Sequence, residues 1–225
     1  MTAGQAIQRG RTMSTTTIIA IDGPAAAGKG TLAKRLAAEL GFDYLDTGLI
    51  YRAVGMKVLD AGFDPADPAR AGEAARDLEP ADLQGPDLRT DEAAQAASKV
   101  ASIPAVRDAL LDFQRRFAAT PPGGKGAVLD GRDIGTVVCP DAPIKLYVTA
   151  SAETRAERRL KELQAKGIAT TFDLVLAEMK ERDERDSSRA VAPLKPADDA
   201  HLLDSSALDA DQAFDVAIAF VRAKL

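Results

Sequence analysis

A nine-residue loop rich in glycine and alanine follows the first apolar run of the chain, and it reads Gly23-Pro24-Ala25-Ala26-Ala27-Gly28-Lys29-Gly30-Thr31. The β-branched run 17–21 before it predicts a buried strand, and the leucines at 32, 36 and 40 after it have helical spacing. A strand, the pattern G-x-x-x-x-G-K and a helix together predict a P-loop. Its backbone N–H groups and the positive end of the helix hold phosphate, and Lys29 reaches the β- and γ-phosphates.

The residue after Lys29 departs from the commonest P-loop. Gly30 stands where a Ser or Thr usually ligates magnesium, and Thr31 follows it. The order G-K-G-T resembles nucleoside-monophosphate kinases more than GTPases or motor ATPases. The alternative is a glycine-rich turn that binds nothing, but the strand, the spacing, the lysine and the helix all favour phosphate.

Length and charge limit what the chain can do. Its 225 residues can bury a core as one domain with appendages or as two small domains. The formal net charge of −5 makes it a poor binder of nucleic acid, so a local cluster of arginines and lysines must hold any anionic substrate. No apolar run reaches about 18 residues, and we therefore expect no membrane span.

Scarce residue types exclude further classes of site. One cysteine, Cys139, excludes an intramolecular disulfide and fits a reducing cytosol, and its apolar neighbours predict a small buried side chain. One histidine, His201, excludes a histidine-based metal site or triad and is expected to be structural. Without asparagine the guanine-specificity motif N-K-x-D of GTPases is impossible, and the H-R-D and D-F-G motifs of protein kinases are missing.

Strand-like runs alternate with helical patterns along the chain, at 17–21, 42–45, 127–130, 144–148 and 200–203. This alternation predicts a parallel sheet covered on both faces, with ligands at the carboxyl ends of its strands. The spacing of Phe214, Ala217, Ile218 and Val221 predicts a final amphipathic helix. Residues 1–16 predict a disordered N-terminal extension.

Two segments interrupt the alternation. Residues about 60–100 are rich in Asp, Pro, Ala and Gly and predict a small inserted subdomain. Residues about 153–189 form a charged run that predicts a helical hairpin broken at Gly167. The core is then expected to comprise residues 17–59, 101–152 and 190–225.

Three arginine-bearing segments are candidates for phosphate chemistry. Arg52 follows a Thr-Gly turn that opens a helix, and an arginine there can fork onto a phosphate. The segment 130–135 ends a strand, where Asp130 can hold magnesium through water and Arg132 projects into the cleft. The densest arginine cluster, 182–189, predicts a mobile lid that closes over the charge of a phosphoryl transfer. Capped helices, a salt-bridged loop and solvated charges are the structural alternatives.

Taken together, these motifs resemble those of the bacterial cytidylate kinases, a family of nucleoside-monophosphate kinases. The matching motifs run in order through residues 17–225. They are Ile21-Asp22-Gly23-Pro24 through Thr31, Leu45-Asp46-Thr47-Gly48 with Tyr51-Arg52, Gln95-Ala96-Ala97-Ser98-Lys99-Val100-Ala101, Val106-Arg107, Asp130-Gly131-Arg132-Asp133-Ile134-Gly135-Thr136-Val137-Val138 and Lys180-Glu181-Arg182-Asp183 through Val191-Ala192-Pro193-Leu194.

The resemblance implies an α/β P-loop nucleoside-monophosphate kinase fold: a five-stranded parallel sheet flanked by helices, with a nucleotide-binding insert and a helical lid. It also implies roles for the matched positions. Residues 23–31 would hold ATP; Arg52, Arg132 and Arg189 would grip the acceptor phosphate, and Thr47 would add a hydroxyl there. Arg182 and Asp186 would contact its ribose, and Ser98, Arg107 and Asp133 would read cytosine. Arg158, Arg182 and Arg185 would belong to the lid, and Arg158 would also bind ATP. Lys29, Arg132, Arg182, Arg185 and Arg189 would be catalytic, and Thr31 and Asp130 (through water) would be the magnesium ligands.

The insert departs from the family pattern. The family commonly carries extra antiparallel strands there, whereas residues about 73–90 are too few and too poor in β-branched residues for them. Base chemistry supports the assignment independently, because Asp133 can accept from cytosine N4 and Arg107 can donate to N3 or O2. Uracil reverses two of these polarities and would leave buried groups unpaired.

These residues predict transfer of the γ-phosphoryl group of MgATP to CMP or dCMP. A P-loop kinase for UMP, AMP or a metabolite such as shikimate is the first alternative. A slowly hydrolysing P-loop switch that signals to a partner is the second, and a structural protein comes last. The expected partners are small nucleotides, not nucleic acid or membrane, and the expected state is a cytoplasmic monomer.

Overall fold

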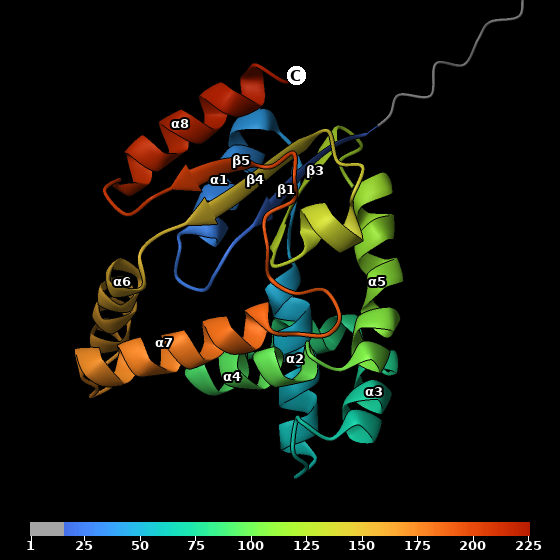
Figure 1. Ribbon diagram of the computed structural model, residues 1–225. Coiled ribbons are helices and arrows are strands. Elements are labelled where there is room, and N and C mark those ends of the chain that lie inside the picture. Colours follow the sequence, from blue (N-terminus) through green and yellow to red (C-terminus); the bar gives the residue numbers. More distant parts are fainter. Residues whose placement is uncertain (1–15) are drawn as a thin grey trace, which may run out of the picture.

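A five-stranded, all-parallel sheet forms the centre of the computed structural model, which describes residues 16–225 (Figure 1). Its order is β2-β3-β1-β4-β5, and the bounds are β1 Thr17–Asp22, β2 Asp43–Asp46, β3 Gly126–Gly131, β4 Ile144–Thr149 and β5 His201–Asp204. Each strand expected from the sequence is confirmed to within one residue at either end. Apart from Thr16, the extension expected for residues 1–16 lies outside the described residues.

Alternate residues of the central strand β1 enter two different cores, as the period of a strand requires. Ile19 and Ile21 pack with α1 (Lys29–Leu40) and α8 (Ala210–Arg222) on one face of the sheet. Ala20 faces the other way, toward α5 (Pro104–Ala119) and the short π-helix η3 (Ile134–Val138). The predicted parallel sheet covered on both faces is therefore confirmed.

A second core lies below the carboxyl edge of the sheet and consists of helices alone. The helices α2 (Thr47–Asp60), α3 (Pro68–Arg76), α4 (Asp91–Val100) and α5 bury one cluster that runs from Ile50 to Leu110. Two short 3₁₀ turns, η1 (Pro80–Gln84) and η2 (Pro86–Arg89), join α3 to α4. The described chain between α2 and α5 contains no strand, which agrees with its poverty in β-branched residues.

The charged run forms a helical hairpin of α6 (Ala152–Ala165) and α7 (Phe172–Ser187), which we call the lid. Gly167 adopts a φ of 75° between the two helices, where the sequence predicted a break. The hairpin has a small core of its own, and the P-loop residues Ala25 and Ala26 pack against it. Figure 1 shows α7 running alongside α4, below the sheet.

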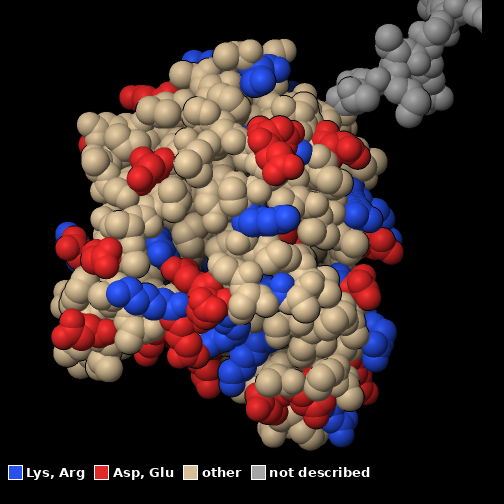
Figure 2. Space-filling model, in the orientation of Figure 1, with Lys and Arg blue, Asp and Glu red and all other residues tan. Residues whose placement is uncertain are grey.

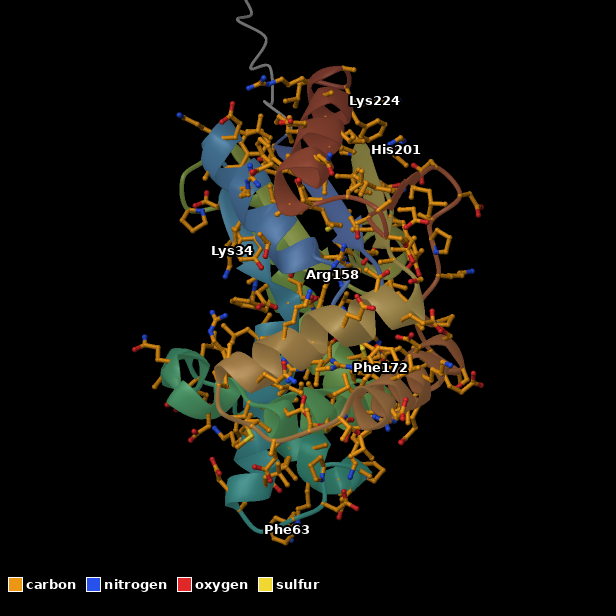
Figure 3. The ribbon with its side chains drawn as sticks, turned by 90° about the vertical axis from the view of Figure 1, so that its left-hand side faces the viewer. Lys34, Phe63, Arg158, Phe172, His201 and Lys224 are labelled. Carbon is orange, nitrogen blue, oxygen red and sulfur yellow. The ribbon has the colours of Figure 1, made fainter. Side chains whose placement is uncertain are left out.

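The remaining sequence expectations concern the C-terminal part of the sheet. Ala217, Ile218 and Val221 of α8 are buried, as their spacing predicted. The His201 ring stacks on Phe220, with 4.2 Å between the ring centres, which gives it a structural role near the top of the molecule (Figure 3).

The single cysteine and the helices agree with two further expectations. Cys139 is buried, and burial raises the pKa of its thiol to about 11, as expected of an unreactive side chain. Within residues 16–225, none of the helices combines the length and apolar character that a membrane crossing requires.

Helices α2 and α4 approach so closely that only glycine fits at one position. A Cβ built on Gly55 would lie 2.7 Å from Ala96 Cβ and 3.0 Å from the Ala96 carbonyl carbon. Gly55→Ala should therefore lower the free energy of unfolding by about 1–2 kcal/mol, because overpacking outweighs the better helix propensity of alanine. Chemical denaturation measures this.

Gly85→Ala is the matched control, because Gly85 has a φ of −61° and its nearest neighbour, Leu88 Cγ, lies 3.6 Å from the built Cβ. That variant should match the wild type within about 0.5 kcal/mol. Equal stability of both variants and the wild type would contradict the packing argument.

Candidate functional site

A cavity of about 730 Å³ lies where the carboxyl edge of the sheet, the helical subdomain and the lid meet. It is large enough for small-molecule ligands. Acidic and basic side chains intermingle over the lower part of the molecule, where these elements come together (Figure 2). The predicted site residues that line the cavity are Ala25, Ala26, Ala27, Gly28, Lys29, Gly30, Thr31, Thr47, Arg52, Ser98, Arg107, Asp130, Arg132, Asp133, Arg158, Arg182, Asp186 and Arg189.

The P-loop occupies one wall of this cavity. Its first residue, Gly23, has a φ of 144°, and a Cβ there would lie 1.9 Å from the Val148 carbonyl oxygen of β4. The loop ends at Gly28, which caps α1 in the left-handed conformation. Lys29 is buried and its Nζ donates to the Pro24 carbonyl at 2.7 Å. Burial and the nearby Arg132 lower the pKa of Lys29.

Asp22, the last residue of β1 before the P-loop, ties that loop to the segment carrying Arg132 and Asp133. Its carboxylate accepts hydrogen bonds from the backbone N–H groups of Ile134 and Gly135, each at 2.7 Å. Burial raises the pKa of Asp22 to about 7 in spite of these two bonds. No role for Asp22 was predicted from the sequence, although a carboxylate directly after an apolar run and before a P-loop was a usable signal.

Asp130 stands beside the P-loop at the end of β3. The Tyr44 hydroxyl donates to its Oδ2 at 3.3 Å, and Thr47 Oγ1 donates to its backbone carbonyl at 2.7 Å. A Cβ built on Gly30 would lie 3.3 Å from Asp130 Oδ2, so the carboxylate fills the space beside the glycine. Burial and the neighbouring Asp46 raise the pKa of Asp130 to about 6.

The carboxylate of Asp186 gathers the cationic groups on the far side of the cavity. Arg132 Nε donates to Asp186 Oδ2 at 3.1 Å, Arg189 donates to Oδ1, and the Ser98 hydroxyl donates to Oδ1 at 3.0 Å. These arginines lower the pKa of Asp186 although it is buried. Residues from α4, β3 and the lid thus meet at one carboxylate.

Arg182 is the arginine of this group that makes no hydrogen bond to Asp186. Its Nε is buried and has no hydrogen-bond partner within the described chain, and the same holds for the Nε of Arg189. Burial and the positive charge of Arg132 lower the pKa of the Arg182 guanidinium to about 10, which leaves it charged at neutral pH. Around Asp186 the partly buried cations Arg132, Arg182 and Arg189 therefore outnumber the carboxylate, and an anionic ligand would balance them.

A second buried ion pair lies deeper in the cavity. Arg107 of α5 pairs with Asp133, donates to the Ala101 carbonyl at 3.4 Å and lies 5.8 Å from the centre of the Tyr51 ring. Burial raises the pKa of Asp133, while Arg107 counteracts it. The structure thus brings Arg107 and Asp133 together as the sequence suggested, but it bonds Ser98 to Asp186 instead.

Arg158 borders both the main cavity and a smaller one of about 220 Å³. Its guanidinium donates to the Ser205 carbonyl at 2.6 Å, to the Ser205 hydroxyl at 3.0 Å and to the Leu208 carbonyl at 3.3 Å. In Figure 3 it lies between α6 and the lower end of α1. The smaller cavity is lined mainly by apolar groups, with Leu32, Val148 and Ala213 among them.

Three predicted residues do not line the main cavity. Gly23 and Pro24 lie behind the P-loop wall. Arg185 points to the side, where it pairs with Glu181 and donates to Gln95 Oε1 at 3.4 Å. Conversely, the lining includes Tyr44, Tyr51 and Arg159, to which the sequence assigned no role.

The cytidylate kinase family model matches residues 19–223 of this chain. A cytidylate kinase of Paramagnetospirillum magneticum is 76% identical over 208 residues, which is 92% of this chain and 99% of that protein. A cytidylate kinase of Granulibacter bethesdensis is 63% identical over 92% of this chain and 97% of its own length.

A solved structure gives the same picture at the level of the fold. An uncharacterized protein from Eubacterium ventriosum superimposes with a TM-score of 0.52 at 17% identity, over 92% of this chain and 99% of that one. At this identity the likeness concerns the fold alone.

The raised pKa of Asp22 gives stability a distinctive pH dependence. In the unfolded chain Asp22 loses its proton near the ordinary pKa of 3.8, whereas in the folded chain it keeps that proton up to about pH 7. Raising the pH between these two values therefore favours the unfolded state and lowers the free energy of unfolding. The unfolding free energy of the wild type, measured against Asp22→Asn, should fall between about pH 4 and about pH 7 and then level off. Denaturant titrations across that range measure the difference.

Asp199→Asn is the contrast, because a hydrogen bond from Lys145 lowers the pKa of Asp199. The stabilisation by Asp199 is complete at neutral pH and is lost in acid, so that variant's deficit should shrink as the pH falls. A pH-independent difference between the wild type and Asp22→Asn would contradict the assignment for Asp22.

Proposed function

This chain belongs to the cytidylate kinase family, and on that premise we propose which of its residues carry each part of phosphoryl transfer from ATP to CMP or dCMP. The observation that carries the proposal is the cavity itself. A P-loop with a buried lysine forms one side, and the partly buried arginines around Asp186 form the other. A donor phosphate would contact the lysine on one side of the cavity and an acceptor phosphate would contact the arginines on the other, so that the two phosphates face each other.

ATP binds along the P-loop, residues 23–31. The loop amides and Lys29 hold the β- and γ-phosphates, for which Lys29 would give up its bond to the Pro24 carbonyl. The adenine ring enters the smaller cavity beside the loop, between Arg158 and the segment Ser205–Leu208. The mainly apolar lining there suits a flat base, and Arg158 can stack on it.

The residues beside the P-loop fit a magnesium ion that arrives with ATP. No group of three His, Cys, Asp or Glu side chains within residues 16–225 could hold a metal by itself. Magnesium typically keeps waters and binds one or two carboxylates plus substrate phosphates, and Asp130 next to Gly30 supplies that carboxylate. Thr31 offers a hydroxyl from the loop. Magnesium neutralises phosphate charge at this position when it is bound.

The acceptor phosphate occupies the far side of the cavity. Arg132 and Arg189, already paired with Asp186, and Arg52 would grip its oxygens, with the Thr47 hydroxyl nearby. Arg182, whose Nε lacks a partner, and Asp186 would contact the ribose. Arg185 does not line the cavity and is held by Glu181 and Gln95, so we assign it to movement of the lid.

The buried pair Arg107 and Asp133 reads the base. Asp133 accepts from the N4 amine of cytosine, while Arg107 donates to N3 or O2. Uracil would leave Asp133 facing a carbonyl oxygen, and a buried carboxylate without its donor is costly. Ser98 contributes through Asp186, to which its hydroxyl is bonded.

The transfer itself needs no general base, because the attacking phosphate oxygen is already ionised at neutral pH. The protein contributes position and charge: Lys29 stabilises the donor side, and the arginines stabilise the charge that spreads over the transferred group. Every residue assigned here belongs to one chain, so a monomer suffices for the reaction. The cytoplasm, where its nucleotide substrates are made and used, is the compartment we propose.

The proposal is tested by ADP release with MgATP and a panel of CMP, dCMP, UMP, AMP and GMP. Turnover with CMP and dCMP should exceed turnover with the other acceptors by at least about a hundredfold, as expected of a polar buried base site. Comparable turnover with UMP would refute the roles of Arg107 and Asp133. ATP hydrolysis that no acceptor stimulates would refute the kinase assignment.

Arg132→Ala tests the acceptor side. It removes a cation that pairs with Asp186, so kcat should fall by about a hundredfold or more while the fold is kept. Steady-state kinetics and thermal unfolding measure the two effects. Arg222→Ala is the control, because Arg222 is exposed and pairs only with Glu39 on the surface. Full activity of Arg132→Ala would refute its assignment.

A further inference from the structure

Arg155 is a buried arginine outside the cavity, and its guanidinium connects three parts of the molecule. It belongs to the first turn of α6 and is 5% exposed. Its Nε donates to the Ala150 carbonyl at 2.9 Å, at the point where β4 gives way to the lid. One terminal nitrogen, Nη1, donates to Asp183 Oδ1 at 3.1 Å, and the other, Nη2, donates to Oδ2 at 2.7 Å.

The third connection reaches the P-loop. Nη1 also donates to the Ala25 carbonyl oxygen at 3.4 Å, and this is the longest of the hydrogen bonds that Arg155 makes. Packing supports the same contact, because Ala25 and Ala26 lie against the apolar core of the lid. Ala26 has a φ of 57°, which an alanine adopts only where its surroundings hold it.

The partner of this guanidinium is well placed in the sequence of α7. Asp183 directly follows Arg182, and Asp186 lies three residues further along the same helix, close to one helical turn away. Fixing Asp183 therefore fixes how far and at what angle α7 presents Arg182 and Asp186 to the cavity. Only the arginine fork can bind both carboxylate oxygens and still reach two carbonyls.

From this geometry we propose that Arg155, through Asp183, is a positioning residue that sets the spacing between the P-loop and the substrate-binding residues of α7. The inference rests on the proposed function, because it assigns the ATP phosphates to the P-loop and the acceptor to α7. Arg155 contacts neither substrate. It determines whether the donor and acceptor phosphates, each bound at its own half of the cavity, meet at reacting distance.

The signature of such a role is a split between binding and turnover. Each half of the cavity keeps its own groups when the link is broken, so ATP alone and CMP alone should bind with dissociation constants within about threefold of the wild type. The kcat at saturation should fall by about tenfold to about a hundredfold, the size expected for a small misplacement of reacting groups. A merely structural role would weaken binding and stability together.

Three variants test the proposal: Arg155→Lys, Asp183→Asn and the double variant. Calorimetry gives the two dissociation constants, and ADP release with CMP gives kcat. Because either substitution breaks the same link, the double variant should be no slower than the slower single variant. Asp183 is partly exposed, so Asp183→Asn provides the result if Arg155→Lys fails to fold.

Asp199→Asn is the matched control. It also removes the carboxylate partner of a buried cation, Lys145, but at a site away from the cavity. Its kcat should stay within about twofold of the wild type.

The proposal is overturned if both single variants keep kcat within about twofold of the wild type. It is also overturned if the loss resides in the dissociation constants at unchanged kcat, or if the two losses multiply in the double variant. A wild-type chain without CMP-dependent turnover would instead refute the proposed function. Active variants beside an active wild type would refute this inference alone.

Discussion

Positive charges that repel each other must be held together in a buried cleft, and the carboxylate of Asp186 makes this possible. Arg132 and Arg189 both donate hydrogen bonds to this carboxylate. Arg182 lies close enough to Asp186 that each of the two charges shifts the pKa of the other residue. Without a carboxylate, three partly buried guanidinium groups would repel one another where solvent screens them less than at the surface. With one carboxylate they remain assembled, and an excess of positive charge remains for an anionic ligand.

The parallel sheet explains why residues so far apart in sequence can share this carboxylate. In a parallel sheet every strand ends at the same edge, so the P-loop after β1 and Asp130 and Arg132 at the end of β3 lie side by side. The register pairs Ile21 with Asp130 and Asp22 with Gly131, which brings the Asp22 carboxylate within reach of Ile134 and Gly135. The lid then adds Arg182 and Asp186 from the opposite side, and the segment directly after α7 adds Arg189.

Local patterns in the sequence predicted the parts of this architecture that depend on local chemistry. Short runs with apolar residues marked all five strands, and the glycine pattern marked the P-loop, because strand period and loop geometry are set by nearby residues. The arginines were found because phosphate chemistry requires them, and the resemblance to a known family ordered them.

Partners in space were harder to predict, because they depend on packing between distant segments. The bond from Ser98 to Asp186 joins residues 88 positions apart, and the bonds of Asp22 span more than 110 positions. Arg155 belongs to a charged run in which most arginines face solvent or the cavity, and no spacing rule separates the buried one. Arg185 shows the reverse: the sequence groups it with its neighbours, but helical geometry turns it away from the cavity.

The difference between lysine and arginine in this cleft follows from the same burial. Lys29 is buried beside Arg132, and its pKa is lowered, since an ammonium loses much hydration and can give up its proton. Arg182 experiences burial and the same neighbour, yet the pKa of its guanidinium falls only to about 10 and its charge persists at neutral pH. A lysine at that position starts from a lower pKa, so the same surroundings would bring it much closer to neutrality. The crowded acceptor side therefore favours arginines, whereas the donor side tolerates a lysine because only one cation is needed there.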